Sequence, residues 1–104
     1  MNGFQITFFT QQDREHHGKP IGEWLIELAK ELHLHGATLV AAAAGIGHSG
    51  RIHSARFFEL ADQPLEIVTI VTADEADALF ARLRAENLRL FYVKTPVEFG
   101  TLGA

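Results

Sequence analysis

Three closely spaced glycines with basic side chains beside them are the residues of this 104-residue chain best suited to bind a ligand. The run G-A-T-L-V-A-A-A-A-G-I-G-H-S-G-R begins as an apolar strand and ends in a loop with Gly45, Gly47 and Gly50. His48 and Arg51 lie beside these glycines. Glycine lets backbone N–H groups come close to a ligand and adopts positive φ without steric cost. Successive N–H groups of such a loop form a concave nest for phosphate oxygens. The pattern therefore predicts an anion or nucleotide site.

The apolar pattern of the first half predicts the elements that hold this loop. Residues 3–10 are rich in Phe, Ile and Thr and predict a strand. Residues 20–34 repeat apolar side chains at helical spacing, and Gly36 is expected to end that helix as a residue of positive φ. Residues 38–44 predict a buried strand that leads into the loop, residues 45–54.

The second half repeats the alternation of strand and helix. Residues 65–72 predict a strand, and Thr72 with Glu75 has the spacing of a capping box that opens a second helix. Asn87 is expected to end that helix in a left-handed conformation, and residues 88–94 to form the last strand.

This order of elements is β-α-β-β-α-β, which predicts an α+β fold, a ferredoxin-like sandwich with an antiparallel four-stranded sheet. The chain is expected to form one domain, residues 1–104. Residues 11–20 are expected as a loop and residues 55–60 as an extended hairpin arm, and the last strand should end before Thr95 and Pro96.

The composition is that of a globular protein, with 47% hydrophobic and 21% charged residues. The formal net charge of -4 provides no basic surface for nucleic acid, and the absence of cysteine excludes disulfides and thiolate metal sites. No signal peptide is evident at the N-terminus, and no apolar run reaches the ~20 residues of a membrane helix. We therefore expect a soluble, cytoplasmic protein.

The strand over residues 65–72 is apolar on both faces. Ile67 and Val71 share one face, and Val68 and Ile70 share the other. Two helices cover only one face of a four-stranded sheet, and burial of the second face is favourable at roughly 25 cal/mol per Å². The pattern predicts an oligomer in which a neighbouring subunit covers that face.

The element order and five strings resemble PII-type signalling proteins, and more closely the PII-like family catalogued as a domain of unknown function, DUF190. The strings are G-A-T-L-V, G-I-G-H-S-G, D-R-E-H-H-G-K-P, G-R-I-H-S-A and L-A-D-Q-P-L-E-I-V. The resemblance covers nearly the whole chain. It implies a homotrimer that binds an adenine nucleotide between its subunits. We expect the nucleotide-bound state to signal to an unidentified protein partner, for which a membrane transporter is one candidate.

Carried over residue by residue, the resemblance places Thr38 near the base of the site and Val71 beside the adenine. The residues that it implies to line the nucleotide are Gly45, Ile46, Gly47, His48 and Ser49.

The chain also departs from PII proteins, which carry a glycine-rich loop with lysine before the last strand, followed by a pair of arginines. Here the corresponding strings are A-E-N-L-R and P-V-E-F-G. The loop after Gly45 is also shorter than the PII regulatory loop and lacks its modified tyrosine. We therefore expect AMP or ADP rather than ATP. The positive charge that binds the phosphates would come from two loops at the same edge of the sheet. We expect it from Arg14, Lys19 and Arg51, helped by His16 and His17.

Six histidines raise the alternative of a metal-binding protein: His16, His17, His33, His35, His48 and His53. Their short spacings suit copper or nickel at a surface, but no helical H-x₃-H pair and no cysteine supports a specific site, so none is assigned. A divalent-metal-binding trimer of the tolerance type therefore stays an alternative, as does a ligand-free accessory domain of a transporter. Since no nucleophile has an evident base and oxyanion stabiliser, we expect neither catalysis nor a required cofactor.

Overall fold

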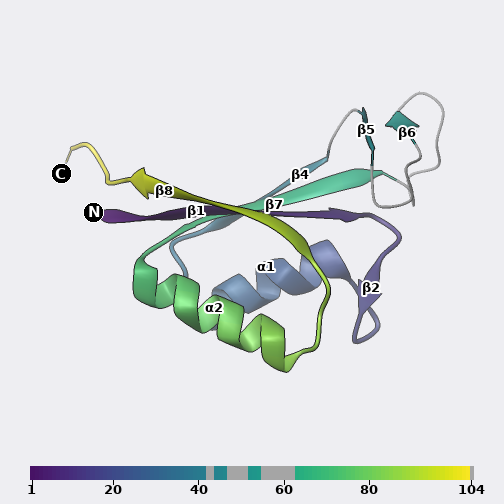
Figure 1. The fold of residues 1–104 in the computed structure, drawn as a ribbon, viewed down its shortest axis with the longest axis horizontal. Helices are drawn as coiled ribbons and strands as arrows, with labels where there is room; N and C mark the ends of the chain where they lie inside the picture. The colour runs from purple at the N-terminus through teal and green to yellow at the C-terminus, as the bar shows by residue number, and fades with distance from the viewer. Residues whose placement is uncertain (42–43, 47–51, 55–62, 104) are drawn as a thin grey trace.

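Two helices lie on one side of a four-stranded antiparallel sheet (Figure 1). The computed structural model describes residues 1–41, 44–46, 52–54 and 63–103. The strand order is β4-β7-β1-β8. The four strands are β1 (Asn2–Gln11), β4 (Ala37–Ala41), β7 (Pro64–Val71) and β8 (Phe91–Glu98). The predicted ferredoxin-like sandwich is thus confirmed.

The helices α1 (Ile21–Glu31) and α2 (Ala73–Ala85) pack on the face of the sheet where alternate residues of the central strands point. Ile6 of β1 and Val71 of β7 are completely buried there, as is Ile21 of α1. The other residues of this core are Phe8, Trp24, Leu25, Leu28, Ile67, Ala76, Leu79 and Leu83. Most of these residues have the strand or helix spacing that predicted the elements.

Both helices end in the same hydrogen-bond pattern around a left-handed residue. In α1 that residue is His33 (φ 55°), and the N–H of Leu34 donates to the carbonyl of Ala29 at 3.0 Å. In α2 it is Asn87 (φ 55°), as predicted. The expected role of Gly36 is wrong, because the helix ends at Glu31 and Gly36 has no positive φ. Histidine takes the left-handed conformation more readily than most side chains, so the chain turns three residues earlier.

The predicted capping box opens α2. The Thr72 hydroxyl accepts from the N–H of Glu75 at 3.2 Å, and the Glu75 carboxylate accepts from the N–H of Thr72 at 2.8 Å. The last strand differs from its prediction, because β8 begins at Phe91 and continues through Pro96 to Glu98. Proline is tolerated there since β8 is an edge strand, and only one of its sides needs hydrogen bonds.

Two short strand pairs lie outside the main sheet. The first, β2 (Glu15–His16) with β3 (Lys19–Pro20), is a hairpin within the predicted loop of residues 11–20. The second, β5 (Ala44–Ile46) with β6 (Ile52–Ser54), shortens the strand predicted over 38–44 and adds a ladder inside the predicted glycine loop. The hairpin arm predicted over 55–60 lies outside the described residues.

The sheet face opposite the helices carries exposed apolar side chains, and we call it the open face. Register places Phe9, Val68 and Ile70 on it, from the two central strands. The same register adds Val40 of β4 and Val93 of β8, together with Phe91. The two helices leave this face uncovered, so the predicted second apolar face is present (Figure 1).

Candidate functional site

Two segments leave the main sheet at the same end of its strands, where β1 and β4 end and β7 begins, and we call this end the loop edge. The last residue of β1, Gln11, is paired with Pro64, the first residue of β7, and Ala41 at the end of β4 is paired with Leu65. The N–H of Gln12 donates to the carbonyl of Gln63 at 2.9 Å across this edge. The hairpin segment 12–20 and the glycine-containing segment 42–62 therefore both join the sheet there, as predicted.

The predicted nucleotide-binding residues of β4 and of the segment 42–62 are described only in part. Thr38 lies in β4 with an exposed side chain on the open face, opposite Val68. Gly45 and Ile46 lie in β5, where they pair with β6. The remaining candidates of this segment lie outside the described residues: Gly47, His48, Ser49, Gly50 and Arg51. Their roles stay predictions.

The basic side chains of the hairpin segment are engaged by the protein itself. The guanidinium of Arg14 donates to the carbonyl of Arg89. The ammonium of Lys19 lies 2.5 Å from the carboxylate of Glu27 on α1, and this hydrogen bond raises the pKa of Lys19. Contact of either side chain with a phosphate would require these partners to be exchanged.

Val71 lies far along the sheet from the predicted nucleotide-binding residues at the loop edge of the same chain. It lies at the opposite end of β7 from the loop edge, paired with Phe4, and its side chain is completely buried under the helices. A ligand would therefore meet the backbone of Val71 rather than its side chain.

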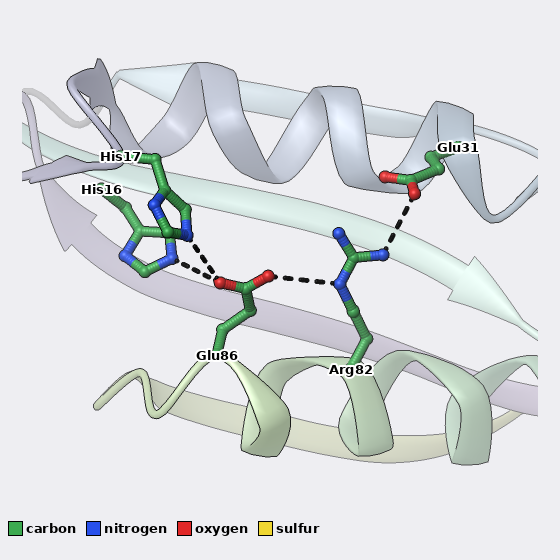
Figure 2. A network of polar contacts seen from close by, with 5 residues as sticks. All are labelled: His16, His17, Glu31, Arg82 and Glu86. Carbon is green, nitrogen blue, oxygen red and sulfur yellow. Dashed lines mark hydrogen bonds and ion pairs between the residues drawn. The ribbon is translucent and has the colours of Figure 1, made fainter.

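The structure adds a polar cluster that sequence reasoning missed (Figure 2). His16 Nε2 and His17 Nε2 lie 3.1 Å and 2.8 Å from the same oxygen, Oε2 of Glu86. The Nε of Arg82 donates to the other oxygen, Oε1, at 3.3 Å. A second nitrogen of Arg82 donates to Glu31 at 3.1 Å, so the cluster connects the hairpin, α2 and α1.

Local backbone geometry explains why two adjacent histidines point at one carboxylate. His17 occupies the hairpin turn with φ 52°, and Gly18 follows with φ 77°. The His16 ring packs edge-on against Trp24 at 4.5 Å, which keeps its side chain only 15% exposed. Glu86 is the C-cap residue of α2 and stands four residues after Arg82. That spacing indicates the Arg82–Glu86 pair, but no local signal connects Glu86 to histidines 69 and 70 residues away.

These contacts lower the pKa of the Glu86 carboxyl to about 2, through hydrogen bonds from His17, from His16 and from Arg82, against the opposing effect of burial. The pKa of Arg82 is raised, first by its hydrogen bond to Glu31 and then by that to Glu86. The carboxylate is therefore held in its charged form beside two imidazoles. His16, His17 and Glu86 each offer one ligand atom, and these atoms lie within 4.8 Å of one another.

Comparison with known proteins agrees with the fold. The family model of DUF190, described as Uncharacterized ACR, matches residues 3–98. The UPF0166 protein of Aquifex aeolicus (strain VF5) is 36% identical over 70 residues, which are 67% of this chain and 67% of that protein.

Solved structures of PII-like proteins share the fold at low sequence identity. CPII from Thiomonas intermedia K12, a nitrogen regulatory PII-like protein bound to ADP, AMP and bicarbonate, superposes with a TM-score of 0.70 at 14% identity, over 97% of this chain and 91% of its own. A PII-like signalling protein from Thermus thermophilus gives a TM-score of 0.68 at 19% identity, over 92% and 87%. By its family match this chain therefore belongs to the DUF190 family, and its fold is that of PII-like proteins.

Proposed function

We propose that this chain is a PII-like regulatory protein that binds AMP or ADP in clefts between the subunits of a homotrimer. It acts as a single domain, residues 1–104, without catalysis and in the cytoplasm. No helix in the described part of the chain is long and apolar enough to cross a membrane.

The observation that carries the proposal is the meeting of two segments at the loop edge. The hairpin segment contains Arg14, and the segment 42–62 contains the glycines and Arg51. Backbone N–H groups of closely spaced glycines and guanidinium groups are both suited to phosphate oxygens. The ADP and AMP bound by CPII, which shares this fold, support the ligand class.

The trimer is supported by the open face. Exposed apolar side chains there include Ile70 on a central strand and Val93 on the edge strand, which are 37% and 45% exposed. A contiguous apolar surface on a sheet is a typical subunit interface. Thr38 belongs to the same face, so a subunit that covers it would also come close to a predicted nucleotide-binding residue.

The proposed mechanism is that bound nucleotide changes the surface that residues 42–62 present to a protein partner. A ligand shifts such an equilibrium only by its difference in affinity for the two states, and a nest of N–H groups closed around phosphate provides that difference. The partner is unidentified, and a membrane transporter is one candidate for it.

Calorimetry with AMP, ADP, ATP and cyclic nucleotides tests the proposal. We expect saturable binding of AMP or ADP, a weaker response to ATP, and a weakening by Arg51→Ala of about 10- to 100-fold, since a hydrogen bond to a charged group contributes about 1.5–3 kcal/mol. Arg84→Ala, at an exposed position on α2, is the matched control and should bind as the wild type does. Absence of binding across the panel at millimolar ligand would overturn the proposal. A metal-binding trimer or a ligand-free accessory domain predicts that absence.

A further inference from the structure

We propose that His16, His17 and Glu86 form a binding site for a divalent transition-metal ion of the Zn²⁺ and Co²⁺ class. The three residues differ from Arg14, Arg51 and the glycines on which the proposed nucleotide site rests. Two imidazole nitrogens and one carboxylate oxygen converge from the hairpin tip and from the C-terminal end of α2 (Figure 2).

The distances suit such an ion. Zinc binds imidazole nitrogen at about 2.0–2.1 Å and carboxylate oxygen at about 2.0–2.2 Å, which places tetrahedral ligand atoms about 3.4 Å apart. The two Nε2 atoms lie 3.1 Å and 2.8 Å from Glu86 Oε2, and all three atoms lie within 4.8 Å of one another. To hold the ion, each nitrogen moves away from Glu86 Oε2 by a few tenths of an ångström, and the two imidazoles turn toward each other to close their wider separation of up to 4.8 Å.

The backbone already orients both rings. Adjacent residues of an extended strand point to opposite sides, whereas the positive φ of His17 turns its side chain to the side of His16. The centroids of the two imidazole rings lie 4.1 Å apart, and the Trp24 ring packs against the His16 ring. Less side-chain freedom is therefore lost when an ion is bound.

Arg82 donates a hydrogen bond to the second oxygen of the Glu86 carboxylate. Carboxylates that bind a metal ion are commonly held in this way by a further hydrogen bond. Glu31, at 3.1 Å, balances the positive charge of Arg82. Arg82 therefore repels a cation bound at the histidines less strongly, and the cation is attracted by the negative charge of Glu86. This arrangement leaves Oε2 directed at the two imidazoles (Figure 2).

The ligand set selects the class of ion. Imidazole favours Zn²⁺, Co²⁺, Ni²⁺ and Cu²⁺ over Mg²⁺ and Ca²⁺, which prefer oxygen ligands alone. Three protein ligands leave a fourth position for water or another small ligand. The bound ion would cross-link two parts of the chain that are 70 residues apart.

The test uses tag-free, full-length protein that has been freed of metal with a chelator and then titrated with Co²⁺ and Zn²⁺. We expect one ion per chain, a visible absorption band of tetrahedral Co²⁺ that Zn²⁺ abolishes, and no response to Mg²⁺. His17→Asn and Glu86→Gln should each weaken binding at least tenfold. Asparagine suits the turn because it tolerates positive φ.

His33→Asn is the matched control, since His33 is also left-handed but lies outside the cluster. It should bind Co²⁺ as the wild type does, and circular dichroism should be unchanged in all three variants. The proposal is overturned if the wild type binds neither ion at 1 mM, or if His17→Asn and Glu86→Gln leave its affinity unchanged. It is equally overturned if His33→Asn weakens binding as much as they do. Nucleotide titration of Glu86→Gln, a residue outside the predicted nucleotide site, keeps this outcome apart from that of the proposed function.

Discussion

Replacing Ile70 with lysine places a charge on the open face, on one of its central strands, while leaving the fold of the single chain nearly undisturbed. Ile70 lies on the central strand β7, opposite Gln5, and alternates with Thr69 and Val71, which are buried under the helices. Its side chain is already 37% exposed, so in a separate subunit the lysine ammonium reaches water. The loss of strand propensity costs the fold at most about 1 kcal/mol.

In the proposed trimer the same substitution acts on association. Complete burial of an isoleucine side chain is worth about 1.5–3 kcal/mol, and the exposed share of Ile70 corresponds to about 0.6–1 kcal/mol per subunit. Lysine loses that gain and adds a desolvation cost of several kcal/mol for each unpaired buried charge. The change for three subunits exceeds about 5 kcal/mol, which raises the dissociation constant more than about 10³-fold.

Sedimentation velocity at micromolar protein measures this directly. We expect the wild type to sediment as a trimer and Ile70→Lys as a folded single subunit with an unchanged circular dichroism spectrum. Ala81→Lys adds the same charge at an exposed position of α2 and should remain trimeric. The reasoning is refuted if Ile70→Lys keeps the mass of the wild type, or if the wild type itself is a single subunit.

Two further predictions concern the fold and the polar cluster. Gly3→Ala should lower the free energy of unfolding by about 3 kcal/mol in urea, because its Cβ would lie 2.0 Å from the backbone oxygen of Val71; a loss below about 1 kcal/mol would contradict this. For Glu86 the folded pKa of about 2 lies below the ordinary 4.5, so the unfolded chain binds more protons between these values, and stability is lost as the pH falls through them. In metal-free protein Glu86→Gln should flatten this acid limb, measured by urea unfolding against pH, and an acid limb identical to that of the wild type would show that the cluster does not hold the carboxylate charged.

Elements whose signal is local were predictable from the sequence. The capping box needs only Thr72 and Glu75, and Asn87 has both the position and the side chain of a left-handed helix end. Gly36 failed as a helix end because the α1 pattern allowed several stops, and His33 satisfies the same hydrogen bonds three residues earlier. The length of β8 depended on its place at the edge of the sheet, which strand order decides and local spacing does not.

The polar cluster was beyond local reasoning for a different reason. Adjacent histidines indicated at most a surface chelate, and the carboxylate that gives them a common direction comes from the end of α2. Only the packing of the hairpin against that helix end brings the three side chains together. Sequence spacing reports neighbours along one element, whereas this contact joins two elements that are distant in the chain.

The same cluster limits the positive charge that is available to bind phosphate. His16 and His17 were expected to help bind phosphate, yet both lie against the ionised carboxylate of Glu86, which repels an anion at that point. Lys19 is likewise neutralised by Glu27 at 2.5 Å. The hairpin therefore offers a nucleotide less positive charge than its sequence indicates. Of the basic residues predicted from the sequence, we therefore expect Arg51 to carry most of the phosphate recognition in the proposed site, together with the N–H groups of the neighbouring glycines. This limited supply of charge suits one or two phosphates better than three, and it makes Arg51→Ala the most informative substitution in the nucleotide titration.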